Sequence, residues 1–392
     1  MNLHLPRLFA IALACAALAA AAAEPLRIGY LSTTSTGPTT GVSKEARAGF
    51  DFALEQLGGS LGGLPVEVIS GDDQANPDVG KQVLDRLIKR DHIALLTGPM
   101  ASGVLYATAP LAVQQRVFFF NLNVGPRDLV GDKCSPYYFN TGWPIEGINE
   151  ALGGHLAEQG VKKVFALGAA VPVGREHLEA FKRGYGQPLV GEIFYKLQTL
   201  DFSAELAQIR VAQPEAVYAF AFGPLAVNFV KQYAQAGLGH IPLYGPAPLA
   251  DEDGVAAAGE AMLGVTTAGH WSADLPHEAN KRFVAAFRSK HGRNPSMFHE
   301  QGYSTALLLH AGLSAAQGRV DDHRRLRQAF VGVQLELPRG PLRFNVDHSP
   351  VQNVYLRKVV KGEGGEMTIR TQRTIATAQT RRGAAICRTD GY

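Results

Sequence analysis

A regular alternation of short apolar segments and amphipathic helices constrains the fold of the first third of the chain. The expected strands are apolar runs at residues 26–31, 66–69, 93–97 and 117–120. The segment after the first run carries Phe50, Ala53, Leu54 and Leu57 at helical spacing. Continuously apolar strands are typical of parallel sheets covered on both faces. This region therefore predicts a doubly wound α/β lobe.

The same rhythm starts again after the loop at 121–144, with expected strands at residues 163–167, 189–194, 216–220 and 242–244. Two more helices, at 278–291 and 298–317, precede a hairpin-like end. The roughly 370 residues that follow position 23 exceed what one hydrophobic core usually holds. We expect two doubly wound parallel-sheet lobes joined by a multi-strand hinge. The predicted N-terminal lobe comprises 24–140 plus about 273–335, and the C-terminal lobe 141–272 plus about 336–392.

Residues 1–23 have the pattern of a secretory signal peptide. Arg7 precedes an apolar run at 8–18, and Ala21 to Ala23 form a small-residue cleavage site before Glu24. We expect cleavage there and a periplasmic protein. A membrane anchor is the alternative, but this apolar run is too short to span roughly 30 Å of hydrocarbon.

Two cysteines, Cys134 and Cys387, remain after this cleavage. An even pair in an oxidising compartment favours a disulfide over two free thiols. Their separation excludes a compact zinc knuckle.

Several functional classes lack support in the sequence. The formal net charge is only +3, and the basic stretches lack interleaved aromatic residues, so we expect no nucleic-acid partner. No nucleophile elbow, zinc-protease helix, phosphate-binding loop or dinucleotide fingerprint is present. An enzyme is the main alternative to a binding protein, and the lack of these motifs disfavours it.

Candidate binding residues lie where the expected strands end. In doubly wound sheets the ligand lies beyond the carboxyl ends of the strands, here in the cleft between the lobes. Thr36 belongs to a loop rich in hydroxyls and glycine after the first strand, and Met100, Ala101 and Ser102 follow the third. A helix start with free backbone N–H groups and a serine hydroxyl suits a carboxylate. The alternative is that Ser102 only caps the helix.

The order and spacing of several short motifs resemble those of the type I periplasmic solute-binding proteins of branched-chain amino acid ABC transporters. The resemblance covers nearly the whole mature chain and rests on the opening strand at 26–31 with Gly37-Pro38, Asp72-Asp73-Gln74, Gly98-Pro99, Tyr244-Gly245-Pro246, Gln301-Gly302-Tyr303 and the ending 340–344. It implies a clam-like fold, no cofactor, no enzymatic activity, a monomer, and ABC permease subunits as partners.

The chain departs from the amino acid binders of this family. The resemblance implies that the Ser102 loop, with Asn121 and Asn123 after the fourth strand, holds a carboxylate. Ala247 stands where the family places the acid that receives a ligand ammonium, and Val173 stands where it has a tyrosine. A buried ammonium without a counter-charge is costly, which argues against a free amino acid.

An amino acid ligand remains the alternative, because Asp251 or Asp253 could replace the missing acid. We favour an aromatic or other apolar carboxylate. The run at 134–139 and the segments 343–345 and 348–350 resemble the family members that bind aromatic acids.

An aromatic acid needs flat apolar walls and an anion seat. Phe222 and Trp143 are the loop aromatics expected to supply the walls, whereas Phe120 and Phe220 are expected to belong to the core. Arg175 is a candidate for the anion seat or, equally, a solvated residue at a helix start. A sensor subunit for a membrane receptor is a further alternative, since transport and sensing use the same closed clam.

Overall fold

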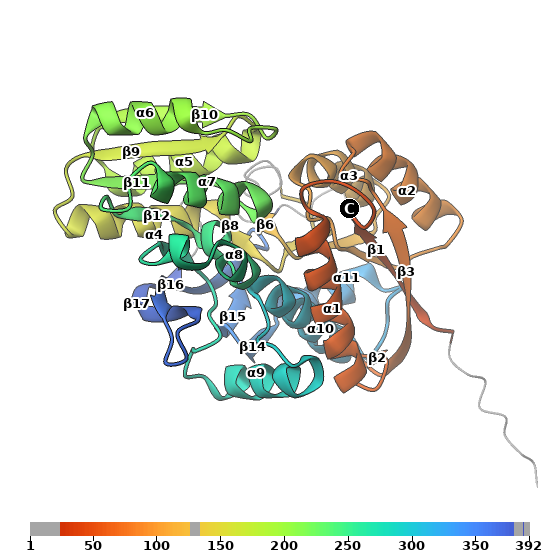
Figure 1. Ribbon diagram of the computed structural model, residues 1–392. Helices are drawn as coiled ribbons and strands as arrows, with labels where there is room; N and C mark the ends of the chain where they lie inside the picture. Colours follow the sequence, from red (N-terminus) through yellow and green to blue (C-terminus); the bar gives the residue numbers. More distant parts are fainter. Residues whose placement is uncertain (1–23, 126–133, 380–386, 388–392) are drawn as a thin grey trace, which may run out of the picture.

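The computed structural model describes residues 24–125, 134–379 and 387, and it shows two α/β lobes side by side (Figure 1). The predicted signal peptide at 1–23 lies outside these residues. The predicted α/β class with two doubly wound lobes is confirmed. Among the described residues, no helix has the length and apolar character needed to cross a membrane.

The first lobe contains a six-stranded sheet in which every neighbouring pair except β2 and β3 is parallel. In spatial order its strands are β2 (Ser60–Leu61), β3 (Leu64–Asp72), β1 (Leu26–Ser32), β4 (Leu95–Thr97), β5 (Phe118–Asn121) and β7 (Tyr138–Asn140). The helices that connect them are α1 (Thr40–Gln56), α2 (Pro77–Lys89) and α3 (Ser102–Gln114). All residues of β4 and β5 are buried, as the continuous apolar runs predict. Strand β7, which is equally buried, lies within the segment that was expected to be a loop.

The second lobe contains a nine-stranded sheet. Its strands are β10 (Gly191–Tyr195), β9 (Val164–Ala169), β11 (Ala216–Ala219), β12 (Leu243–Pro246), β13 (Thr266–Gly269), β16 (Pro350–Lys361), β15 (Gly340–Phe344) and β14 (Gln334–Leu337), with β17 (Met367–Gln379) beside β16. The first five are parallel, and the later strands pair antiparallel. This sheet is therefore mixed rather than wholly parallel, because its last strands are joined by hairpin-like connections instead of crossover helices.

The helices of the second lobe are α4 (Ile145–Glu158), α5 (Pro172–Tyr185), α6 (Ser203–Ala212), α7 (Gly223–Gln235) and α8 (Glu252–Ala258), with short 3₁₀ segments η3 (Ala247–Ala250) and η4 (Gly259–Met262). Three more helices follow β13: α9 (Glu278–His291), α10 (Met297–Ala315) and α11 (His323–Val331).

Helix α10 returns to the first lobe and packs along α1. Two glycines permit the close approach of these helices. A Cβ atom on Gly302 would lie 1.8 Å from the carbonyl oxygen of Ala46, and one on Gly49 would lie 1.9 Å from that of His299. No side chain larger than hydrogen fits at either position without moving a helix.

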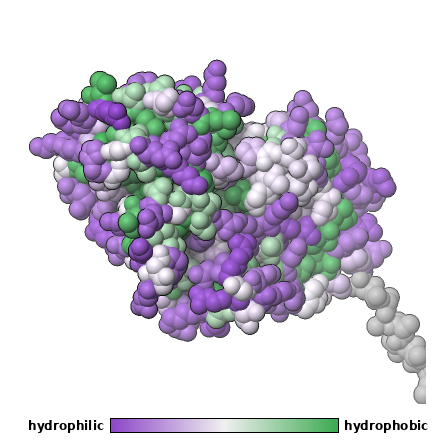
Figure 2. Space-filling view, viewed as in Figure 1, coloured by the Kyte–Doolittle hydropathy of each residue, from purple (hydrophilic) through white to green (hydrophobic). Residues whose placement is uncertain are grey.

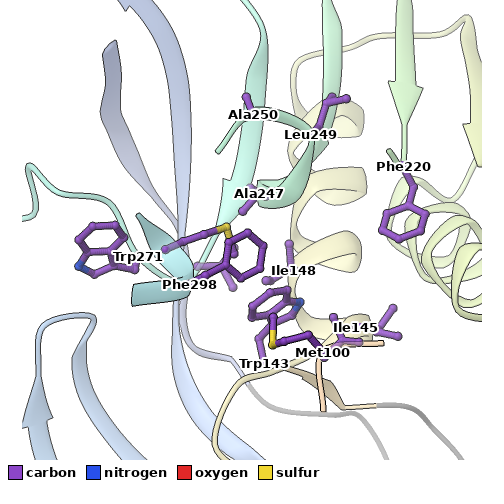
Figure 3. Packing of buried hydrophobic residues seen from close by; sticks show 14 of the residues in the cluster. Met100, Trp143, Ile145, Ile148, Phe220, Ala247, Leu249, Ala250, Trp271 and Phe298 are labelled. Carbon is purple, nitrogen blue, oxygen red and sulfur yellow. The ribbon is translucent and has the colours of Figure 1, made fainter. Parts of the chain in front are cut away.

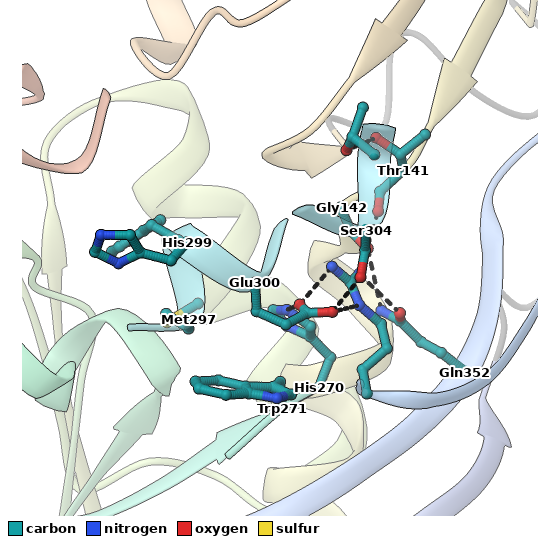
Figure 4. A network of polar contacts seen from close by, with 12 residues as sticks. Thr141, Gly142, His270, Trp271, Met297, His299, Glu300, Ser304 and Gln352 are labelled. Carbon is teal, nitrogen blue, oxygen red and sulfur yellow. Dashed lines mark hydrogen bonds and ion pairs between the residues drawn. The ribbon is translucent and has the colours of Figure 1, made fainter. Parts of the chain in front are cut away.

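A buried ion pair joins segments that are far apart in the sequence. Arg339 donates to both carboxylate oxygens of Glu300, at 2.9 and 2.6 Å, and to the carbonyl oxygens of Thr141 and Gly142. Gln352 accepts a further bond from the same guanidinium (Figure 4). Burial alone would raise the pKa of Glu300, but the adjacent Arg339 cation lowers it to about 2. The network ties α10 to the connection after β7 and to the last strands.

The predicted disulfide between Cys134 and Cys387 is confirmed, with 5.4 Å between the two Cα atoms. The backbone N–H of Cys387 also donates to the carbonyl oxygen of Val346 at 2.9 Å. The bridge attaches a residue near the C-terminus to the segment that precedes β7.

Candidate functional site

A cavity of about 790 Å³ lies where the carboxyl ends of both sets of parallel strands meet. Its lining comes from segments that follow β1, β3, β4 and β5 in the first lobe and β9, β10, β11 and β12 in the second. The surface is hollowed between the lobes at this place (Figure 2). This is the position at which doubly wound sheets bind ligands.

Four helices begin at the cavity. The residues that precede the first turns of α1, α3, α5 and α7 are Thr39, Ala101, Val171 and Phe222, and all four line the cavity. None of them caps its helix with a side-chain hydrogen bond. The first N–H groups of a helix carry a partial positive charge, so the four starts favour a negatively charged ligand.

The loop before α3 forms the first-lobe wall. It begins at Gly98, whose φ of +112° suits glycine, and a Cβ there would lie 2.4 Å from the carbonyl oxygen of Leu31. Asn123 Nδ2 donates to the carbonyl oxygen of Met100 at 3.0 Å, which fixes this loop against the one after β5. Ser102 is the first residue of α3 rather than its cap. Its hydroxyl therefore lies at the cavity without serving the helix.

Aromatic rings form the second-lobe wall. Phe220 and Phe222 both line the cavity, with ring centroids 5.8 Å apart. Behind them His177 stacks on Phe220 at 3.9 Å. Burial lowers the pKa of His177 to about 3, so the imidazole is neutral and provides a flat support. The expectation that Phe220 is only a core residue is incomplete, because this buried ring also faces the cavity.

Trp143 and Phe298 form the floor, and Figure 3 shows the indole between Phe298 and Met100. Trp143 belongs to β8 (Trp143–Pro144), which pairs with β6 (Val124–Gly125). Its ring stacks on His270 with centroids 4.8 Å apart. Burial lowers the pKa of His270 to about 4, which keeps this support neutral near pH 7.

One hydrogen bond crosses the cavity between the lobes. Tyr106 of α3 donates to Glu176 Oε1 of α5 at 2.6 Å, and both residues line the cavity. Glu176 supplies the only carboxylate of the lining, and no lysine or arginine lines this cavity within the described part of the chain. Among the described lining residues, positive potential therefore comes from the backbone dipoles at the helix starts.

The structure brings together seven of the eleven residues that the sequence proposed for ligand binding. These lining residues are Met100, Ala101, Ser102, Asn123, Trp143, Val173 and Phe222. They come from both lobes and from the segment that connects them.

Two of the other four residues belong to the first lobe and lie outside the lining. Thr36 is exposed in the bend before α1, where the neighbouring Pro38 and Thr39 reach the cavity instead. Asn121 is fully buried, and its Nδ2 donates to the carbonyl oxygen of Val124 at 2.7 Å and to the hydroxyl of Tyr138 at 2.9 Å. Asn121 therefore stabilises the loop after β5 without lining the cavity.

The remaining two belong to the second lobe. Arg175 is exposed, with its guanidinium carbon 4.4 Å from the centre of the Phe194 ring, so it does not form an anion seat in the cavity. Ala247 is fully buried, and its carbonyl oxygen accepts a bond from Arg357 at 3.2 Å. Its neighbour Pro248 is the lining residue.

Neither acid considered as a replacement for Ala247 lines the cavity. Asp251 caps α8 by accepting from the N–H of Gly254 at 2.6 Å, and burial raises its pKa to about 6. Asp253 forms an ion pair with Arg293 at 2.8 Å.

Sequence reasoning missed several lining residues, including Thr39, Tyr106, Glu176, Gln198 and Phe298. Tyr106 and Glu176 could have been found from the helical period. Each lies about one turn beyond a lining residue, Ser102 and Pro172 respectively. Helical spacing does not identify Phe298 in this way, because it lies on α10, far along the chain from the other lining residues.

Residues 25–365 match the periplasmic binding protein family. The chain belongs to this family. The solute-binding protein is 29% identical to a Leu/Ile/Val-binding protein homologue of Brucella melitensis, a match that covers 91% of this chain and 93% of that relative.

Solved structures with the same fold include solute-binding proteins of ABC transporters. One from R. palustris, in complex with benzoate, is 30% identical with a TM-score of 0.86, and covers 92% of this chain and 99% of its own. Another, from Rhodopseudomonas palustris BisB5 in complex with 3,4-dihydroxybenzoic acid, is 30% identical with a TM-score of 0.84 and the same coverage.

These relatives confirm that the chain is a solute-binding protein of the ABC transporter type rather than an enzyme. The family acts outside the cytoplasm, so the protein is extracytoplasmic. Within the described residues, no group of three or more histidine, cysteine or acidic side chains is placed to hold a metal ion.

Proposed function

We propose that this protein captures a small aromatic carboxylate between its lobes and delivers it to an ABC permease. The observation that carries the proposal is the convergence of four helix starts without side-chain caps on a cavity whose described lining is largely apolar and holds no lysine or arginine. Backbone N–H groups bind carboxylates well at such positions. Ser102 adds a hydroxyl donor at the start of α3.

The rest of the lining supports an aromatic ligand. Phe220, Phe222, Trp143 and Phe298 all line the cavity. Figure 3 shows Phe220 apart from Trp143 and Phe298, so aromatic rings lie on more than one side. Flat apolar walls around a few polar groups are typical of sites for small organic ligands. The benzoate and 3,4-dihydroxybenzoate complexes of the two R. palustris proteins agree with this choice.

A branched-chain or other amino acid is the second candidate, and Glu176 is the observation that favours it. Its carboxylate lines the cavity and could receive an ammonium group. Glu176 Oε1 already accepts the hydroxyl of Tyr106, however, and the position of Ala247 offers no acid. We therefore consider an amino acid a less favoured ligand than an aromatic carboxylate.

The mechanism we propose is a population shift. Contacts from both lobes make the closed form more stable when ligand is bound, and the permease recognises that form. We propose residues 24–140 with about 273–335, and 141–272 with about 336–392, as the moving lobes. We also propose that residues 1–23 are cleaved on export to the periplasm and that the mature protein is a monomer.

A thermal-shift screen tests the ligand class. We expect benzoates at about 100 times their dissociation constant to add roughly 2.7 kcal/mol to the free energy of unfolding. Benzamide, which matches benzoate without the charge, is the control for the anion seat and should give a much smaller shift. Calorimetry should confirm the ranking. Tighter binding of leucine or valine than of any benzoate would replace this proposal by the amino acid alternative.

A further inference from the structure

Trp143 has a buried hydrogen-bond donor that no atom in the described part of the chain satisfies. The side chain is fully buried, lines the cavity, and its Nε1 lacks a partner among the described residues. An indole N–H can only donate, and a buried one ordinarily has an acceptor. Leaving such a group unpaired is unfavourable, so a ligand that supplies an acceptor gains affinity.

The second tryptophan of the chain shows the usual arrangement. Trp271 is equally buried, but its Nε1 donates to Asn280 Oδ1 at 2.7 Å. It lies beyond Phe298 from Trp143 and is absent from the lining (Figure 3). Of these two tryptophans, the one at the cavity has no acceptor within residues 24–125, 134–379 and 387.

The indole of Trp143 is held rigidly. It stacks on His270, and its strand pairs with β6 through Val124. Its own carbonyl oxygen accepts a bond from Asn140 Nδ2 at 3.2 Å. The donor direction is therefore fixed before any ligand binds, and in Figure 3 the indole nitrogen lies on the side of the ring toward Phe220 rather than Trp271.

The surroundings of this donor are apolar. The lining residues Met100 and Phe298 lie beside the indole in Figure 3, and Val124 pairs with Trp143 in the neighbouring strand. The indole N–H is thus a polar group among apolar side chains. At the helix starts, by contrast, several backbone N–H groups and the Ser102 hydroxyl can bind one carboxylate together.

We propose that Trp143 Nε1 donates to a second oxygen of the ligand, so that the preferred ligands are aromatic acids with an oxygen substituent on the ring. This inference rests on the proposed function, because it assumes that the carboxylate occupies the helix starts. The substituent must accept a hydrogen bond, which a hydroxyl or methoxy oxygen does and a methyl group of similar size does not.

The test is a double-mutant cycle between the protein and the ligand, measured by calorimetry. The ligand pairs are 3- and 4-hydroxybenzoate against 3- and 4-methylbenzoate, with benzoate as the reference. The protein variants are Trp143→Phe, which keeps a ring on His270 without the donor, and Trp271→Phe as the matched control. We expect at least one hydroxybenzoate to bind the unmodified protein about tenfold more tightly than its methyl partner.

In Trp143→Phe that preference should disappear: all benzoates lose affinity by a common factor because the floor is altered, and the favoured hydroxybenzoate loses about tenfold more. Trp271→Phe should retain the preference. Equal losses for hydroxyl and methyl ligands in Trp143→Phe would overturn the inference and leave the proposed function intact. Failure of every benzoate to bind the unmodified protein would overturn both.

A second measurement does not depend on the folding of Trp143→Phe. Trp271→Phe leaves Trp143 as the only tryptophan, so its emission reports on the indole at the cavity. A hydrogen bond to the indole shifts that emission to longer wavelength. We expect the shift with hydroxybenzoates and a smaller one with the methyl partners, and identical shifts would contradict the inference.

Discussion

Ser102 occupies the first turn of α3 and is free for the ligand, because the helix does not use it as a cap. Its neighbours Ala101 and Gly103 also line the cavity, so backbone N–H groups and the hydroxyl lie together. At the scale of single residues, this small cluster is where we expect a ligand carboxylate to be bound.

Replacing Ser102 by Ala should weaken carboxylate binding by about 1.5–3 kcal/mol, since one hydrogen bond to a charged group is lost. The melting temperature of the free protein should change little, because no cap is removed. The matched control is Ser203→Ala, which changes the first residue of α6 away from the cavity. Unchanged affinity in a folded Ser102→Ala variant would contradict the role of the hydroxyl.

At the scale of elements, the contact between α8 and α10 contains a carboxyl group in an unusual environment. Glu252 Oε2 accepts from the backbone N–H of Met297 at 3.1 Å, and Glu252 Oε1 is buried without a partner among the described residues. Burial raises the pKa of Glu252 from 4.5 to about 7, against the opposing effect of the Arg357 cation. The folded protein therefore holds a proton here more tightly than the unfolded chain does.

A raised pKa gives a stabilising contribution that is complete below pH 4.5 and is lost as the pH rises through about 7. Glu252→Gln should mimic the protonated form. We expect it to leave stability near pH 4 almost unchanged and to raise the free energy of unfolding at pH 8 by on the order of 1–3 kcal/mol relative to the unmodified protein. Denaturant titrations at both pH values measure this. The exposed Glu363→Gln serves as control, and equal pH profiles for both variants would refute the assignment.

At the scale of the whole molecule, two features connect distant parts of the chain. The bond between Tyr106 and Glu176 joins α3 to α5 across the cavity. The disulfide between Cys134 and Cys387 joins positions separated by 253 residues. The first acts between the lobes, and the second lies away from the lining.

Tyr106→Phe should lower the affinity of every ligand by a common factor of roughly five, because the closed form loses about 1 kcal/mol of stabilisation. Calorimetry gives the factor, and small-angle scattering should show a more open free protein. Tyr303→Phe is the control, since Tyr303 donates to Gln56 at 2.8 Å, between α10 and α1. A loss confined to one ligand would instead identify Tyr106 as a specificity residue.

Cys387→Ser should lower the melting temperature modestly and leave ligand affinity unchanged, because neither cysteine lines the cavity. The loop-closure entropy of so long a loop gives an upper limit of about 4–5 kcal/mol, and a short terminal segment gains less. A reductant should destabilise the unmodified protein to the same extent and have no effect on Cys387→Ser. Loss of binding in this variant would show that the bridge supports the site.

The sequence by itself determined the α/β class, most strands and helices, the disulfide, and the loops that reach the cavity after β4 and β11. The elements follow from local periodicity, the loops from the rule that the carboxyl ends of parallel strands share one edge, and the disulfide from the two cysteines of an exported chain. That rule explains why Met100, Ser102 and Phe222 were found without coordinates.

Only the tertiary structure decided which neighbours in each loop and helix face the ligand. Arg175 and Glu176 are adjacent on α5, yet Glu176 lines the cavity and Arg175 stacks on Phe194 outside it. Successive residues of a helix point about 100° apart, so the side that faces inward depends on how the helix packs. The pairing of Tyr106 with Glu176 and the unpaired donor of Trp143 likewise arise from contacts between segments distant in sequence, which local sequence patterns do not specify.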